Sequence, residues 1–141
     1  MSGAPQRWAH ALSIQATLRD TDALGHVNNA VYVNWFEEVR TSYVCTRRGF
    51  RTMDQVDFIL ASTTAHFRAP VYMLEPIEMR CVPVRLGRTS WDLAYEGRSA
   101  KDGRLVVEGT STQVQYDYMK HEPVPIPDGW RALLEADRVT P

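Results

Sequence analysis

Residues 19–29, RDTDALGHVNN, hold the side chains whose types and spacing are best suited to chemistry. Two carboxylates, an imidazole, two carboxamides and a glycine fall together where a strand-like pattern gives way to a helical one. A helix N-terminus presents unpaired N–H groups and a partial positive charge, so it favours an anion or a developing oxyanion. A carboxylate held just before it is placed to act as nucleophile or general base on an ester-like carbonyl.

A capped loop is the simplest alternative reading of this segment. Asp20 or Asp22 would then close local turns, while Asn28 or Asn29 would cap the helix and His26 would fill a polar gap. Capping requires one such residue, whereas the segment brings several together. The combination therefore favours a functional site.

The elements that would position this loop follow from the hydrophobic pattern. Residues 11–19 alternate apolar and polar side chains as a strand does. From residue 29 to about 47, apolar residues recur at three- and four-residue steps, which predicts a long helix that ends at Gly49. Everything after it is strand-like until a short terminal helix at 130–136, with strands expected at residues 58–68, 77–83, 91–96 and 105–116.

One helix with an apolar stripe must be buried by the sheet that follows it. The sequence thus predicts a single α+β domain, residues 1–141, with an antiparallel five-stranded sheet wrapped around one long helix. The helix covers one face of such a sheet. The other face and the edges remain to be covered, and pairing with a second copy is the simplest way, so we expect at least a homodimer.

Composition and charge argue against several classes of protein. With 16 basic and 17 acidic residues the net charge is −1, which does not favour nucleic acid as a partner. We expect no membrane partner and a cytoplasmic location, because neither a spanning segment nor a signal sequence is evident. Cys45 and Cys81 are expected to be reduced, and the scattered histidines and cysteines predict no metal site.

The loop motif resembles that of the hotdog-fold acyl-CoA thioesterases, in particular the 4-hydroxybenzoyl-CoA thioesterase-like family. The resemblance rests on Arg19-x-x-Asp22-x-x-Gly25-His26-Val27-Asn28-Asn29, followed on the helix by Tyr32, Glu37 and Arg40. Weaker matches extend over most of the chain, among them residues 67–70. The resemblance implies a hotdog fold, hydrolysis of an acyl thioester without a cofactor, and a site between the subunits of a homodimer or homotetramer.

The resemblance also assigns roles to particular residues. Asp22 matches the catalytic carboxylate, as nucleophile or as base on water. Residues 26–30 match positions that line the substrate, with backbone N–H groups near Asn29 and Ala30 polarising the thioester carbonyl; they are His26, Val27, Asn28, Asn29 and Ala30. A polar Asn29, where some members carry an aromatic residue, argues against transferring the 4-hydroxybenzoyl specificity.

The phosphates of coenzyme A (CoA) would suit the guanidinium groups of a predicted hairpin. Its candidate residues are Arg85, Gly87, Arg88 and Ser90, for which a solvated charged turn is the alternative. Another hotdog branch uses a helical glutamate in place of the loop aspartate, for which Glu37 and Glu38 are the candidates here. A non-catalytic module that binds acyl-CoA or acyl-carrier protein remains the alternative function.

Overall fold

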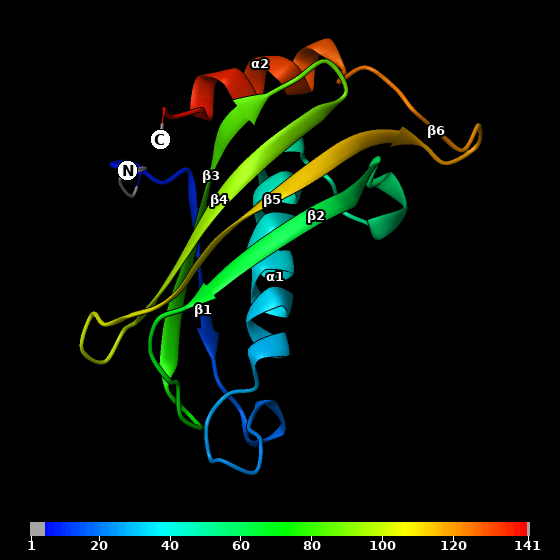
Figure 1. Cartoon of the computed structure of the whole chain (residues 1–141). Helices are drawn as coiled ribbons and strands as arrows, with labels where there is room; N and C mark the ends of the chain where they lie inside the picture. Colours follow the sequence, from blue (N-terminus) through cyan, green and yellow to red (C-terminus); the bar gives the residue numbers. More distant parts are fainter. Residues whose placement is uncertain (1–4, 141) are drawn as a thin grey trace.

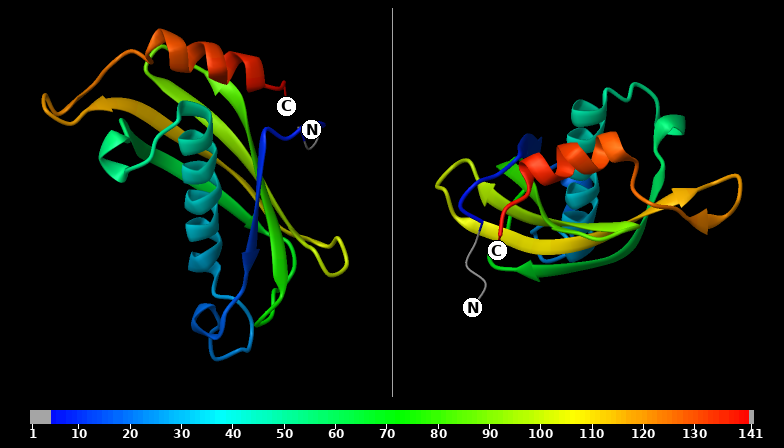
Figure 2. Two further views of the ribbon diagram at one scale, coloured as in Figure 1. Left: turned by 180° about the vertical axis from the view of Figure 1, so that it is seen from behind. Right: turned by 90° about the horizontal axis from the view of Figure 1, so that it is seen from above.

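The structure is a computed structural model and describes residues 5–140. Its antiparallel sheet has the strand order β1-β3-β4-β5-β2, with β6 paired to the end of β5. The sheet curls around α1, and α2 lies across one end (Figures 1 and 2). The bounds are β1 (His10–Gln15), α1 (Asn29–Arg48), β2 (Phe58–Phe67), β3 (Pro76–Leu86), β4 (Ser90–Ser99), β5 (Leu105–Asp117), β6 (Glu122–Pro123) and α2 (Asp128–Asp137). The expected hotdog arrangement is confirmed.

The helix α1 begins and ends where its capping residues stand in the sequence. The side chain of Asn28 accepts a hydrogen bond from the N–H of Ala30, and Gly49, at φ 69°, donates its N–H to the carbonyl of Cys45. The inner face of the helix is buried through the expected apolar stripe, which consists of Tyr32, Trp35, Phe36, Val39 and Tyr43. This stripe against the sheet forms most of the core.

Gly109 of β5 lies directly beneath the side chain of Phe36 of α1. A side chain there would place its Cβ 2.8 Å from the ring of Phe36 and 2.1 Å from the carbonyl oxygen of Thr64. Phe36 lies flat against Tyr95, with ring centroids 4.4 Å apart. Because only a glycine leaves room at this point, Gly109 sets how deeply α1 sits in the curl of the sheet.

The first strand is shorter than its sequence pattern predicts. β1 ends at Gln15, and the rest of the expected strand turns into a short 3₁₀ helix at Leu18–Asp20. The cause is a capping box, in which one oxygen of Asp20 accepts from both the N–H and the hydroxyl of Thr17, at 2.8 and 3.0 Å. This turn redirects the chain into the loop that precedes α1.

The outer face of the sheet carries paired charges. Ion pairs join neighbouring outward-facing residues, namely Arg80 with Glu78, Arg98 with Glu96, and Arg68 with Glu108. Among residues 5–140, these pairs make this part of the face charged, which suits contact with water better than contact with a second copy. From the sequence alone, both the second face and the edges of the sheet are candidate contact surfaces for a second copy. The edges are better suited to such a contact than the charged face.

The second helix closes the end of the domain opposite the 19–29 loop (Figure 1). Its Trp130 and Leu134 are buried, and Asp137 accepts hydrogen bonds from the hydroxyl of Tyr43 (2.7 Å) and from Arg47 (2.8 Å). Burial, and then the nearby Asp137 carboxylate, raise the pKa of Tyr43 far above its usual range. Neither helix within residues 5–140 has the length and apolar character needed to cross a membrane.

Candidate active site

The 19–29 loop is a narrow, hydrogen-bonded loop with Asp22 at its turn. Its two arms are joined by bonds from the N–H of Asp22 to the carbonyl of His26 (3.0 Å) and from the N–H of Asn28 to that of Asp20 (2.9 Å). Gly25, at φ 86°, returns its N–H to the carbonyl of Asp22 at 3.0 Å. A side chain at Gly25 would strain this turn, so the glycine fixes where Asp22 stands.

The carboxylate of Asp22 is oriented by its own loop and remains exposed. Its Oδ1 accepts the N–H of Leu24 at 2.9 Å, which holds the side chain in one direction. Within residues 5–140 its other oxygen, Oδ2, has no protein donor. One oxygen is thus anchored and the other is open to a ligand, which is what a nucleophile or general base requires.

The start of α1 leaves one backbone N–H for a ligand, where the sequence suggested two. The N–H of Ala30 is already bound to Asn28 Oδ1 (2.9 Å), and that of Val31 is bound to the Asn28 carbonyl (2.9 Å). Among the residues that the structure describes, the N–H of Asn29 has no partner in the chain. Asn29 is therefore the donor that could polarise a carbonyl, and Asn28 serves as the helix cap.

The other residues of the loop differ in what they can contact. His26 is half-buried, with its ring edge-on to Tyr72 at a centroid distance of 6.2 Å. Val27 is 3% exposed, so its side chain packs in the core and does not reach solvent as a substrate contact would. Asn29 and Ala30 are exposed.

A second segment, residues 71–75, supports the loop, which the sequence pattern does not predict. The N–H of Val27 donates to the carbonyl of Val71 (2.8 Å), and His26 pairs with Tyr72 in an isolated antiparallel bridge. The N–H of Leu74, a residue at φ 69°, donates to the carbonyl of Ala16 at 2.7 Å. Pro70 and Pro76 mark the segment as a loop, but nothing in the sequence shows which loop it meets.

Glu75 holds this supporting segment in place. It is 8% exposed and accepts the N–H of Tyr72 (3.1 Å) and a 2.6 Å bond from Arg104, whose guanidinium also donates to the carbonyl of Pro70. Burial by itself would raise the pKa of Glu75. Hydrogen bonds from Ser99, Tyr72 and Arg104 outweigh that effect and lower the pKa below its ordinary value of 4.5.

We expect Glu75→Gln to lower the free energy of unfolding at pH 7 by about 1–3 kcal/mol, because Arg104 loses a buried counter-charge. Since the folded-state pKa of Glu75 is lowered, its contribution is present above the unfolded value of 4.5 and is lost as the pH falls through the folded value. Urea unfolding of both proteins between pH 7 and pH 3 measures this. Equal stabilities at pH 7 would contradict the role given to Glu75.

The residues predicted to bind CoA phosphates lie at the other end of the sheet from Asp22. They lie in the turn between β3 and β4 and at the strand ends beside it, and the length of β3 puts that turn roughly 33 Å from the loop. Arg85 is bound to Asp92 (2.7 Å) and Ser90 (2.9 Å), while Arg131 of α2 donates to the carbonyls of Gly87 and Arg88. Arg88 is exposed. One chain therefore does not bring this turn and Asp22 together.

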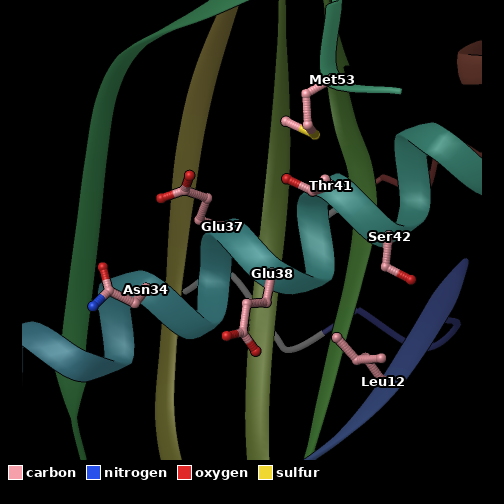
Figure 3. Close-up of a pocket in the computed structure, with 7 residues that line it drawn as sticks. All are labelled: Leu12, Asn34, Glu37, Glu38, Thr41, Ser42 and Met53. Carbon is pink, nitrogen blue, oxygen red and sulfur yellow. The ribbon is translucent and has the colours of Figure 1, made fainter. Parts of the chain in front are cut away.

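Among the hollows that residues 5–140 form are two along α1, and no residue of the 19–29 loop lines either of them. The first, the outer groove, has a volume of about 710 Å³ and is lined by Leu12, Asn34, Glu37, Glu38, Thr41, Ser42 and Met53. Figure 3 shows Glu37 and Glu38 directed to opposite sides of the helix. Neither carboxylate is near an open helix N-terminus, so the geometry gives less support to them than to Asp22 as the reacting group.

The second hollow, the α1–β2 pocket, is smaller and more apolar, with a volume of about 270 Å³. It lies between the stretch of α1 from Glu37 to Cys45 and residues 56–60, which lead into and begin β2, with Met53 and Tyr118 also contributing. The pocket therefore opens beside the edge strand of the sheet.

The sequence model of the thioesterase-like superfamily matches residues 16–134. The chain belongs to the thioesterase-like superfamily. The match spans the 19–29 loop, α1, strands β2 to β6 and most of α2 of this thioesterase-like protein, and it begins just after β1. No curated protein sequence gives a match.

Solved structures of thioesterases share the fold of this thioesterase-like protein. A predicted thioesterase from Bacillus stearothermophilus has a TM-score of 0.86 and 22% identity, covering 94% of this chain and 98% of its own. A thioesterase from Thermus thermophilus, complexed with coenzyme A and Zn, has a TM-score of 0.82 and 24% identity, covering 93% of this chain and 95% of its own. A 1,4-dihydroxy-2-naphthoyl-CoA thioesterase from Synechocystis has a TM-score of 0.79 and 18% identity, covering 89% of this chain and 94% of its own.

The thioesterase-like protein shows no cluster of metal ligands in the part of the chain that the structure describes. Across residues 5–140, no three His, Cys, Asp or Glu side chains are grouped so that they could hold an ion.

Proposed function

We propose that this protein is an acyl-CoA thioesterase, which hydrolyses an acyl thioester to the free acid and CoA with Asp22 as the reacting carboxylate. The observation that supports this best is the pairing of an oriented, exposed carboxylate with an open N–H at the start of α1. Family membership supplies the reaction class. No cofactor takes part in this proposal.

Asp22 would work in one of two balanced ways. As a nucleophile, its Oδ2 attacks the thioester carbonyl carbon and CoA leaves as the thiolate; water then hydrolyses the mixed anhydride. As a general base, it takes a proton from water while the water oxygen attacks the same carbon, and the proton is passed to the leaving sulfur. Either route consumes one water and places an oxyanion beside Asn29.

The N-terminal end of α1 would stabilise that oxyanion. The N–H of Asn29 donates to the carbonyl oxygen, and the partial positive charge of the helix end favours the negative charge that develops there. His26 and Ala30, on either side, would line the thioester. Asn28 contributes by capping the helix, which leaves the neighbouring N–H open.

We also propose that the working unit is a homodimer, or a pair of such dimers, joined through the β2 edges. β2 is ten residues long, contains neither proline nor lysine, and lies at an edge of the sheet. Leu60 and Phe67 on this strand are 43% and 44% exposed. A long edge strand without charged or proline guards favours pairing with another strand.

Antiparallel pairing of β2 with its own copy would assemble one site from two chains. In one chain the start of α1 lies at the Phe67 end of β2, since the rings of Tyr32 and Phe67 are 5.3 Å apart. The α1–β2 pocket and the β3–β4 turn lie at the Phe58 end. A two-fold axis through β2 therefore places the 19–29 loop of one copy beside the pocket and Arg88 of the other.

In this arrangement the α1–β2 pocket takes the acyl group and the arginine turn takes the CoA phosphates. Arg88 is exposed for such a contact, whereas Arg85 would have to share its guanidinium with Asp92. Gly87 and Ser90 shape the turn between them. The separation of turn and loop within one chain is thereby accounted for.

Thiol release from a panel of acyl-CoA thioesters tests the proposed function. A thiol-trapping dye should report turnover of at least one member, and acyl groups that fit the α1–β2 pocket should be hydrolysed fastest. Binding of CoA to the same protein is measured alongside. Tight CoA binding with no hydrolysis of any member would show a non-catalytic acyl-CoA or carrier-protein binding module instead.

A further inference from the structure

Arg40 is a buried cation in the wall of the α1–β2 pocket. It is 5% exposed, and its one hydrogen bond to another side chain of residues 5–140 is donated to the hydroxyl of Tyr95 at 3.1 Å. Within these residues, no carboxylate oxygen lies within 4.0 Å of its guanidinium. Arginine is rarely buried without such a partner. The side chain therefore has donors but no counter-charge.

The polar groups behind Arg40 do not supply a negative charge. The hydroxyl of Tyr95 lies 2.5 Å from that of Ser111, which in turn donates to Gln113, and Gln113 donates to the carbonyl of Trp91 at 3.1 Å. Each side chain of this hydrogen-bonded network is neutral. Tyr95 keeps its proton because burial raises its pKa to about 12 in spite of the nearby guanidinium. The network fixes Arg40 in place and leaves its charge uncompensated.

The rest of the pocket is mainly apolar. Val44, Val56 and Phe58 form its walls, and Glu37 is exposed at the rim that it shares with the outer groove. Because Glu37 faces water, solvent and salt weaken its influence on a group inside. A cavity of about 150 Å³ accepts a benzene ring. The 270 Å³ here is therefore enough for one ring or a short chain with a polar end group.

We propose that the α1–β2 pocket selects acyl groups that carry a carboxylate at the end remote from the thioester, with Arg40 as its counter-ion. This inference rests on the proposed thioesterase function and names its substrate class. A guanidinium suits a carboxylate because it offers paired N–H donors in one plane. The apolar walls contact the body of the acyl group, and Arg40 binds the carboxylate at its end.

Matched pairs of thioesters test this directly. In each pair, of four to eight acyl carbons, a terminal methyl is replaced by a carboxylate, as in hexanoyl-CoA and adipoyl-CoA. For the best-fitting length we expect kcat/KM to favour the carboxylated member by at least about tenfold. In Arg40→Met that ratio should fall below one, mainly through KM, and Arg40→Lys should be intermediate. Arg51→Met, which removes an exposed arginine outside both hollows, is the control and should keep the ratio.

Each outcome bears on either the function or the inference. Hydrolysis of the methyl-ended members with no preference for their carboxylated partners would overturn the role of Arg40 and leave the thioesterase function standing. If no member is hydrolysed, the thioesterase function fails, and calorimetric binding of the same pairs decides about Arg40: tighter binding of the carboxylated member supports it, equal binding overturns it. Dissociation of the dimer in Arg40→Met with an unchanged ratio would also overturn it, because the counter-charge would then come from the second copy.

Discussion

Replacing Asp22 by asparagine is expected to lower kcat/KM for acyl-CoA hydrolysis by roughly 10²- to 10⁴-fold. The amide keeps the shape of the side chain and can still accept the N–H of Leu24, so the loop should retain its geometry. What it loses is the oxygen lone pair of an anion, which serves as nucleophile or base in either route. Thiol release at saturating and limiting substrate, with the melting temperature of both proteins, measures the change.

Asp20 provides the matched control in the same loop. Its carboxylate closes the capping box with Thr17 and points away from the turn that carries Asp22, so Asp20→Asn should change kcat/KM only a few-fold. Because Asp22 is exposed, Asp22→Asn should change the free energy of unfolding by less than about 0.5 kcal/mol. Full activity in a folded Asp22→Asn protein would move the chemistry elsewhere, first to the glutamates of the outer groove.

Mixing two inactive variants is expected to restore activity, because each proposed site draws on two chains. One variant is Asp22→Asn, and the other is Cys45→Trp, which enlarges a side chain of α1 that lines the α1–β2 pocket and not the outer groove. A mixed dimer would hold one site with neither change. If subunits combine at random, half the dimers are mixed and one site in two is intact, so activity should return to about a quarter of the wild-type value.

Subunit exchange must be demonstrated for this result to count. Co-expression with two affinity tags isolates the mixed dimer, and the two pure variants mixed without exchange serve as the inactive control. If each site lay within one chain, every site in the mixed dimer would carry one of the two changes and no activity would return. A monomer in solution would contradict the shared site as well.

The long helix and most of the sheet could be predicted because local sequence determines them. Asn28 and Gly49 are strong helix boundaries, the apolar stripe of α1 has an unmistakable period, and Gly103 forms the turn before β5 at φ 76°. The end of β1 could not be predicted from alternation, because a side-chain interaction between Thr17 and Asp20 stops the strand within an alternating pattern.

Only the part of the candidate site that lies in one contiguous segment, residues 19–29, could be predicted from the sequence. Asp22 and its neighbours stand together in the sequence, but the support from Glu75 and the 71–75 segment depends on contacts between residues far apart in the chain. The burial of Arg40 has the same origin. Its place beside the helical stripe is visible in the sequence, whereas the absence of a nearby carboxylate within residues 5–140 is a property of the packed structure.

The open N–H at the start of α1 also had to be seen in the structure. Helix ends in general leave several donors unpaired, and the sequence does not show which of them the cap will occupy. Here the Asn28 side chain takes the N–H of Ala30, and Asn29 is left. In the proposed site, one backbone donor of one chain would hold the oxyanion, and a pocket of the other chain would hold the acyl group.

A crystal structure of Asp22→Asn with an uncleaved acyl-CoA would test this arrangement most directly. We expect the thioester carbonyl oxygen about 3 Å from the N–H of Asn29, with the side chain at position 22 against the carbonyl carbon. We also expect the acyl group to enter the α1–β2 pocket of the second copy. A thioester seated in the outer groove beside Glu37 and Glu38, with residues 22 and 29 contacting nothing, would contradict it.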